Sequence, residues 1–351
     1  MISIKLGEKL EGGGEGVVYT VEGRPDIVYK QYKPFKVTPA VQNKLNYMLS
    51  LNFNTNMNQH FSWPIEVVGN SSGKLDGFTM NKLKIDIKLN DVYSNKGKAY
   101  PYEFAVVVGI NLCTMVNQIH QQKFEIVIGD FNHDNVGVDT DNSFVSMMDI
   151  DSFHLGKRYP CVVCMPGYAA PELLKYMDEV NVSRFDDPLL LRSFTKETDL
   201  FSLAVHLFRL LMNGVSPYNG INTKIHKSSD VVEAGNKPVK EGHYVFRPGL
   251  EPAHPACPPK YVLTDELLAL FDRAFVDVKN GRDQPRRPKA LEWHRALENY
   301  RRVLKRCAND KTHQYYSALT CCPWCEAERR DKMVLSKISS KLLPPYTVRR
   351  R

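Results

Sequence analysis

Several stretches of the first eighty residues alternate apolar and polar positions in the period-two pattern of β-strands. Residues 4–21, on both sides of a glycine cluster, and residues 27–32 carry this pattern and predict three strands. Residues 63–68 and 75–80 repeat it, and the Asn-Ser-Ser-Gly turn at 70–73 predicts that they form a hairpin. We therefore expect a small antiparallel sheet near the N-terminus.

Helical spacing dominates the rest of the chain. Thr38-Pro39 has the form of a helix start, a capping side chain followed by proline, and predicts a helix to about Leu51. Residues 215–260 are rich in Gly, Pro and Asn and predict a long irregular connection. Short strands are expected over 125–128, 136–138 and 145–148, and helices over 104–120, 199–212, 263–275 and 290–304.

The composition is that of a globular protein, with 43% hydrophobic and 25% charged residues in a chain of 351. No run of about 18 consecutive apolar residues predicts a membrane span, and the N-terminus lacks the apolar core of a signal peptide. We expect a cytoplasmic protein that does not enter the membrane.

The formal net charge of +8 is distributed unevenly. Residues 326–351 hold eight Lys or Arg but only three Asp or Glu. A solvated basic tail is the simpler interpretation, and contact with nucleic acid or an acidic partner is the alternative.

Four of the eight cysteines fall within residues 307–325, which favours a metal site in a chain without an export signal. Cys307, His313, Cys322 and Cys325 offer three thiolates and an imidazole, and the Cys-Pro-Trp-Cys spacing is typical of a zinc knuckle. Cys321 is a substitute for Cys322 in this hypothesis. The alternative is a set of unrelated buried thiols.

A glycine-rich turn precedes a lysine in an apolar strand. Gly12, Gly13, Gly14 and Gly16 lie between two expected strands, where backbone without Cβ can approach phosphates, although a tight hairpin uses glycines in the same way. Lys30 follows in Val-Tyr-Lys, where an ammonium is costly unless it meets an anion. Together the two features favour a phosphate-binding site.

Two carboxylate-bearing loops follow. Asp130 and Asn135 are five residues apart, and Asp149 follows a short expected strand. In phosphoryl transfer a carboxylate accepts the proton of the attacking hydroxyl, while an amide oxygen and a second carboxylate hold Mg²⁺. Two ordinary Asp/Asn turns are the alternative.

The glycine-rich turn, Lys30 and the two carboxylate-bearing loops follow one another in the order found in the protein-kinase family, which the chain resembles over about residues 5–300. The resemblance implies an α+β fold with a small antiparallel β-rich lobe (1–84) and a mainly helical lobe (85–304), followed by a zinc-binding segment (305–328) and a basic tail (329–351). It implies an activation segment that ends at Ala170-Pro171-Glu172, and a bracing role for Asp199 beneath the catalytic loop.

The same resemblance implies ATP and Mg²⁺ or Mn²⁺ as cofactors and assigns roles to individual residues. Asp130 would be the base, Lys30 would bind the phosphates, and Asn135 and Asp149 would hold the metal. The nucleotide would contact Gly12, Gly13, Gly14, Gly16, Val18, Met80 and Lys82, with residues 80–84 as the hinge beside adenine.

Short motifs narrow the resemblance to one bacterial subfamily of Ser/Thr-type kinases. These are Ser62-Trp63-Pro64, Gly77-Phe78-Thr79-Met80, residues 149–153, Tyr159-Pro160-Cys161 and the terminal Cys-Pro-Trp-Cys. Members are often encoded beside a metal-dependent phosphatase and a von Willebrand-type tellurite-resistance protein, and the resemblance implies these two as partners.

The chain departs from the family at several positions. Glu11 and Glu15 place carboxylates where ATP phosphates would lie, which should weaken nucleotide affinity, and Ile128-Gly129 replaces the usual His-Arg. Asp151 replaces a glycine and is a further candidate metal ligand. Residues 33–60 contain no Asp or Glu, so Lys30 lacks the usual helix carboxylate, and we expect Gln42, Asn43 or Asn46 to hydrogen-bond it instead.

The sequence thus predicts an Mg-ATP-dependent kinase that phosphorylates Ser or Thr of a protein substrate, with the chain itself as one candidate substrate. One alternative is a pseudokinase, a nucleotide-binding scaffold without turnover. Another is a nucleic-acid-associated adaptor that works through the zinc knuckle and the basic tail.

Overall fold

The structure is a computed structural model that describes residues 2, 4–53, 58–93, 99–177, 190–221, 236–252, 257–276 and 286–330. Most of the predicted basic tail and part of the predicted irregular connection lie outside these residues. The described chain divides into two compact units, one of residues 1–89 with 111–202 and one of residues 90–110 with those from 203 onward. Helices α3 (Tyr102–His120) and α6 (Lys196–Leu211) contribute to both.

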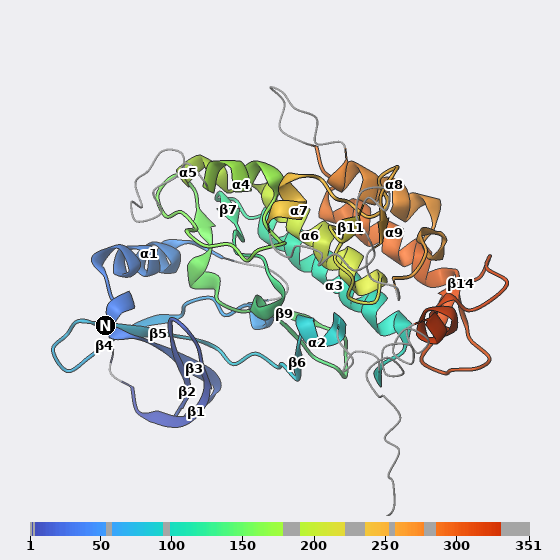
Figure 1. Ribbon diagram of the computed structural model, residues 1–351. Coiled ribbons are helices and arrows are strands. Elements are labelled where there is room, and N and C mark those ends of the chain that lie inside the picture. The colour runs from blue at the N-terminus through green and yellow to red at the C-terminus, as the bar shows by residue number, and fades with distance from the viewer. Residues whose placement is uncertain are drawn as a thin grey trace, which may run out of the picture. The chain divides into compact units, whose positions relative to one another are not determined.

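A five-stranded antiparallel sheet begins the first unit, in the order β1-β2-β3-β5-β4. Its strands are β1 (Leu6–Gly12), β2 (Gly16–Val21), β3 (Arg24–Tyr32), β4 (Glu66–Gly69) and β5 (Leu75–Asn81). Helix α1 (Pro39–Ser50) lies beside this sheet (Figure 1). The strand alternation, the 70–73 hairpin and the α1 start are confirmed, since the Thr38 hydroxyl caps α1 by accepting from the Val41 amide at 3.2 Å.

The core of this region places Lys30 on a buried strand face. Val28, Lys30 and Tyr32 of β3 share one face because side chains two residues apart point the same way. Val28 and Tyr32 pack in a buried cluster with Leu45 of α1 and Phe78 of β5. Lys30 is itself only 7% exposed, so its ammonium must find partners inside the protein.

Short strands then support the two polar loops of the first unit. Strands β7 (Ile126–Val127) and β10 (His154–Leu155) pair with each other, and β6 (Ile87–Lys88), β8 (Val136–Val138) and β9 (Val145–Met147) form a second sheet. One loop joins β7 to β8 and the other follows β9. The Met148 amide donates to the Asn135 carbonyl at 2.9 Å and ties the two loops together.

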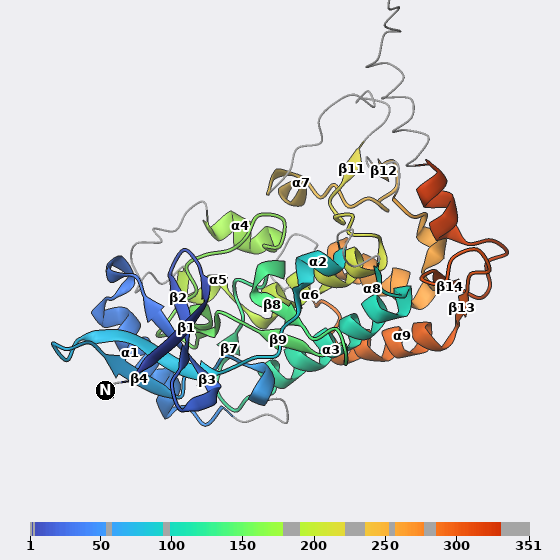
Figure 2. The same cartoon turned by 90° about the horizontal axis from the view of Figure 1, so that it is seen from below.

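The remaining elements are mostly helical, which together with the antiparallel sheet is compatible with the predicted kinase-like fold. Strands β13 and β14 pair as a hairpin after helix α9 (Figure 2), and residues 323–330 are helical. The other elements are α2 (Leu89–Tyr93), α4 (Pro171–Met177), α5 (Leu190–Ser193), β11 (Gly220–Ile221), α7 (Lys237–Lys240), β12 (Glu251–Pro252), α8 (Asp265–Phe275), α9 (Ala290–Arg302), β13 (Leu304–Arg306) and β14 (Gln314–Tyr316).

Helix α3 is the one described helix with the length and hydropathy to cross a membrane, and 56% of its most apolar window is buried. A buried core helix meets the same criteria. The finding is therefore weak evidence for a membrane protein, and the cellular location stays a prediction.

Asp199, in the first turn of α6, braces the loop that carries Asp130. Its carboxylate accepts hydrogen bonds from the amides of Ile128 at 2.8 Å and Gly129 at 3.0 Å, and its Oδ2 lies 2.9 Å from Nε2 of His120. The residue is 1% exposed. Two buried amides thus depend on one carboxylate, as the sequence resemblance implied.

We predict that Asp199→Ala lowers the free energy of unfolding by about 2–6 kcal/mol, because each of the two unsatisfied buried amides costs about 1–3 kcal/mol. Asp199→Asn keeps one acceptor oxygen and should lose less. Urea denaturation of both variants beside the wild type measures the difference. Equal midpoints for Asp199→Ala and the wild type would show that the two amides find other acceptors.

Candidate functional site

A cavity of about 750 Å³ opens within the first unit. This volume is in the range of small-ligand sites, about 300–1,000 Å³. Its wall brings together most of the predicted nucleotide contacts, namely Gly13, Gly14, Gly16, Val18, Lys30, Met80 and Lys82, along with Asn135, Asp149 and Asp151. Gly12 and Asp130 are not among the residues that line it.

The glycines of the β1–β2 turn divide into two kinds. A Cβ on Gly16 would lie 2.3 Å from the Gln31 carbonyl oxygen, so glycine is required there by the close approach of β2 to β3. A Cβ on Gly13 or Gly14 would meet no other atom within 4 Å. These two positions therefore leave backbone open to a ligand, whereas Gly16 has a structural reason of its own.

Lys30 pairs with both carboxylates of the segment after β9. Its Nζ donates to Asp149 Oδ1 at 2.5 Å and to Asp151 at 2.8 Å (Oδ1) and 2.9 Å (Oδ2). Glu15 of the glycine turn approaches the same ammonium at 3.8 Å. The Tyr32 hydroxyl donates to Asp151 Oδ2 at 2.6 Å.

The expectation that an amide of helix α1 holds Lys30 is wrong. In the described part of the chain Lys30 makes no hydrogen bond to Gln42, Asn43 or Asn46, because Asp149 and Asp151 take its donors. Helix α1 instead presents Lys44, which interacts electrostatically with Asp151 and Asp149. In the protein-kinase family the helix usually supplies the carboxylate that pairs with the strand lysine. In this chain the helix carries a cation, Lys44, and the carboxylates lie on the segment after β9.

Burial and charge shift the pKa values of this group. Burial alone would lower the pKa of Lys30, but Asp151 and Asp149 outweigh it and leave that pKa raised. Burial raises the pKa of Asp149 to about 6, against the effect of Lys30. Burial also acts to raise the pKa of Asp151, but the Lys30 ammonium and the Tyr32 hydroxyl outweigh it, so this pKa is lowered. Asp151 is therefore the more firmly ionised of the two carboxylates.

Asp130 is held in the loop after β7 by contacts with two neighbours, Met165 and Asn135. Its Oδ1 accepts from the Met165 amide at 3.0 Å, while the side-chain amide of Asn135 donates to its carbonyl at 3.0 Å and lies 3.4 Å from its Oδ2. The sequence-predicted base and the predicted metal-binding amide are therefore in direct contact. Asp130 is half-buried.

Two backbone conformations shape these loops. Gly129 has φ of +77°, and a Cβ there would lie 2.7 Å from Cβ of Cys161, which explains why glycine occupies this position. Asp149 adopts φ of +54°, in the left-handed region that few non-glycine residues enter. Such a conformation is sustained only where the surrounding contacts fix it, and it is common at functional sites.

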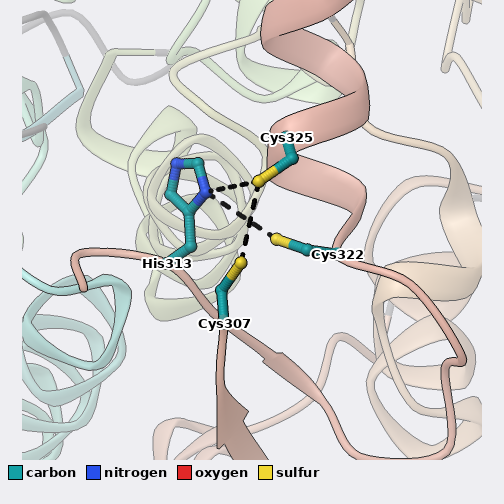
Figure 3. A group of neighbouring side chains, drawn as sticks. All are labelled: Cys307, His313, Cys322 and Cys325. Carbon is teal, nitrogen blue, oxygen red and sulfur yellow. Dashed lines mark hydrogen bonds between the residues drawn. The ribbon is translucent and has the colours of Figure 1, made fainter. Parts of the chain in front are cut away.

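The second unit contains the four metal-ligand candidates of the sequence in one group (Figure 3). Cys325 Sγ lies 3.7 Å from Cys307 Sγ and 3.4 Å from His313 Nδ1, and Cys322 Sγ lies 3.7 Å from the same nitrogen. Metal–ligand lengths of about 2.3 Å for sulfur and about 2.0 Å for nitrogen place tetrahedral ligands about 3.5–3.8 Å apart. The four side chains could therefore hold one tetrahedral metal ion.

Neighbouring groups support the orientation of these ligands. His313 Nε2 lies 3.5 Å from Glu328 Oε1, the carboxylate–histidine arrangement common behind metal ligands. The Asn309 amide donates to Cys307 Sγ at 3.3 Å, and the Trp324 indole donates to the Gln314 carbonyl at 2.5 Å. Cys321, the substitute considered from the sequence, is exposed and outside the group.

Sequence reasoning missed Lys44 and Tyr32 as parts of the charged cluster. Tyr32 carried a usable signal, since it lies two residues after Lys30 and shares its strand face. The sequence carried no such signal for Lys44, because a single lysine among the polar positions of an amphipathic helix is expected to be solvated.

No protein-family model matches the chain. It is 30% identical over 342 residues to "Protein kinase YegI" of Escherichia coli strain K12, and 29% identical over 339 residues to the protein of that name in Escherichia coli O157:H7. These alignments cover 93% and 92% of the chain, which spans about half the length of the two relatives, 49% of each. Over most of its length the chain is thus similar to about half of two bacterial proteins that are named protein kinases.

Proposed function

We propose that the chain is an ATP-dependent protein kinase that transfers the γ-phosphate of Mg-ATP to Ser or Thr of a protein, including itself. The observation that carries the proposal is the convergence of Lys30, Asn135 and Asp149 on one cavity of about 750 Å³ beside a glycine-rich turn. The two kinase-named relatives support the same class of reaction. The protein substrate, the phosphatase and the von Willebrand-type partner stay predictions from the resemblance.

The donor atoms at the cavity suit Mg²⁺, which prefers oxygen ligands. Asn135 uses its side-chain nitrogen as a donor to Asp130, and Asp149 gives Oδ1 to Lys30. Among the described residues, Asn135 Oδ1 and Asp149 Oδ2 have no hydrogen bond and are available as ligands. When bound, Mg²⁺ would neutralise phosphate charge beside these two oxygens.

Asp130 would orient the attacking hydroxyl and take its proton. The Met165 amide engages Oδ1 and the Asn135 amide lies beside Oδ2, so the carboxylate is oriented while Oδ2 retains a lone pair for the hydroxyl. Lys30 would bind the phosphates, since it is one of the residues that line the cavity.

A nucleotide-binding scaffold without turnover is the second candidate, and Glu15 is the observation that favours it. This carboxylate lies in the cavity wall 3.8 Å from the Lys30 ammonium, where it competes with phosphate oxygens for the same cation. The adaptor hypothesis rests on a basic tail that lies mostly outside the described residues.

We propose zinc as the metal of the Cys307, His313, Cys322 and Cys325 group. Three thiolates and an imidazole within the separations of a closed tetrahedral site are the donors that zinc prefers in structural sites. The role would be to fix the segment after α9.

We predict that Asp130→Asn lowers phosphoryl transfer by about 10²–10⁴-fold, the usual contribution of a general base, and that Asp149→Asn abolishes it by removing a metal ligand. Both variants should fold, because Asp130→Asn removes no core volume and in Asp149→Asn the Lys30 ammonium keeps Asp151 as its partner. A radiolabelled ATP assay with magnesium or manganese measures transfer, and Asp26→Asn, an exposed aspartate on β3, is the matched control. A wild-type protein that binds ATP but phosphorylates nothing, itself included, would favour the scaffold.

We predict that Glu15→Gln strengthens nucleotide binding by about two- to tenfold, because it removes one negative charge beside the phosphates. The variant also breaks the 2.5 Å pair with Lys36, a surface interaction worth about 0–1 kcal/mol. Titration with a fluorescent ATP analogue gives the dissociation constant. Glu22→Gln, which breaks a surface pair with Lys5, is the control, and weaker binding by Glu15→Gln would contradict the prediction.

For the metal group we predict about one equivalent of zinc per chain by elemental analysis, lost in Cys322→Ser and in Cys325→Ser. Cys321→Ser is a matched control, since Cys321 adjoins the group in sequence but is exposed. Full zinc retention in the two ligand variants and in Cys307→Ser would exclude this site.

A further inference from the structure

Lys30 has two carboxylate partners, and these differ in how many of their oxygens already accept hydrogen bonds. Asp151 is engaged through both oxygens, by Lys30 at 2.8 and 2.9 Å and by the Tyr32 hydroxyl at 2.6 Å. Asp149 gives Lys30 only one oxygen, at 2.5 Å. The Asp151 side chain is 8% exposed and that of Asp149 31%. A metal ion could therefore reach Asp149 without breaking the contacts of Asp151.

The arrangement also satisfies the three N–H donors of an ammonium. Asp151 can hold Lys30 by itself, so Asp149 is free to turn toward a metal when nucleotide binds. The ammonium would then remain paired and keep one donor for a phosphate oxygen. If Asp149 were its sole partner, the same event would leave a buried cation without a charge to balance it.

Helix α1 supplies no carboxylate that could take this role, since residues 33–60 contain neither Asp nor Glu. The helix offers Lys44, which lines a second cavity of about 670 Å³ together with Tyr32 and Asp151. Asp151 therefore lies among two lysines and a tyrosine hydroxyl, on the segment after β9 rather than on the helix.

We propose that Asp151 is the positioning residue for Lys30, rather than a ligand of the metal at the nucleotide site. Its carboxylate holds the ammonium at the phosphate position in both the free and the nucleotide-bound protein. This inference rests on the proposed function, because it assigns a role at the same site. The two aspartates would thus have different roles: Asp149 would bind the metal, and Asp151 would position Lys30.

The first test compares Asp151→Asn with Asp149→Asn. Loss of Lys30 positioning should lower kcat/KM for ATP by about 10²-fold, the cost of a misplaced reactive group, while the free Mg²⁺ concentration for half-maximal activity stays at the wild-type value. Any residual activity of Asp149→Asn should need more Mg²⁺. A raised Mg²⁺ requirement in Asp151→Asn, with an unchanged KM for ATP, would overturn the proposal and make Asp151 a metal ligand.

The second test measures the chemical reactivity of the Lys30 amine, which depends on its pairing with Asp151, and does not require kinase activity. Acetic anhydride at one fixed pH labels lysines, and peptide mass spectrometry gives the extent at Lys30 relative to Lys5, whose side chain is 81% exposed. Asp151→Asn and the milder Tyr32→Phe should increase labelling of Lys30 severalfold, with Lys5 unchanged. Tyr32→Phe keeps the ring in the core, so it serves if Asp151→Asn does not fold. Unchanged labelling in Tyr32→Phe and in every folded Asp151 variant would overturn the proposal.

A third variant tests whether the carboxylate can be moved. Asp151→Gly should lose activity as Asp151→Asn does, and adding Lys44→Glu returns a carboxylate to the wall of the same cavity. Recovery of kcat/KM in the double variant would support positioning by charge, since a metal ligand could not be replaced from helix α1. If the wild type transfers no phosphate, the proposed function fails, but Lys30 labelling still decides whether Asp151 holds the lysine.

Discussion

The buried ammonium of Lys30 is the constraint on which the proposed nucleotide site depends. Strand alternation turns this side chain toward the core beside Val28 and Tyr32, where an unpaired charge would be very costly. The partners come from residues 149 and 151, more than a hundred residues later, and their carboxylates bind the sheet to the loop after β9. Removing one partner of such a buried pair typically costs about 3–5 kcal/mol, so the pair fixes the loop as well as the lysine.

The other polar loop is fixed by backbone hydrogen bonds rather than by charge pairing alone. Asp199 accepts from two consecutive amides just before Asp130, and the Met148 amide donates to Asn135 of the same loop. Side chains that must meet a substrate within a few tenths of an ångström need support of this kind. The charged cluster therefore orients Lys30 and Asp149, while amide donors orient Asp130 and Asn135.

The metal-ligand group follows a different principle, because all its members lie within residues 307–325. A short segment can bring four ligands together through one hairpin and one helical turn, so the spacing of the cysteines was enough to predict the group. The Cys-Pro-Trp-Cys spacing favoured Cys322, with Cys321 as a substitute, but spacing alone does not settle the choice between them. That choice depends on which of two adjacent side chains the start of the helix at residue 323 turns inward, and the structure selects Cys322.

The sequence by itself determined the elements with strong local signals. Examples are the Thr38 cap of α1, the alternation that buries Lys30, and the loops that carry Asp130, Asn135 and Asp149. It failed at the partner of Lys30, because the absence of acidic residues in α1 suggested an amide from that helix, whereas Asp151 comes from a segment distant in sequence. Local propensity and spacing act over a few residues, but pairing of a buried charge is decided by which distant segments the packed core brings within 3 Å. That information exists only in the tertiary structure.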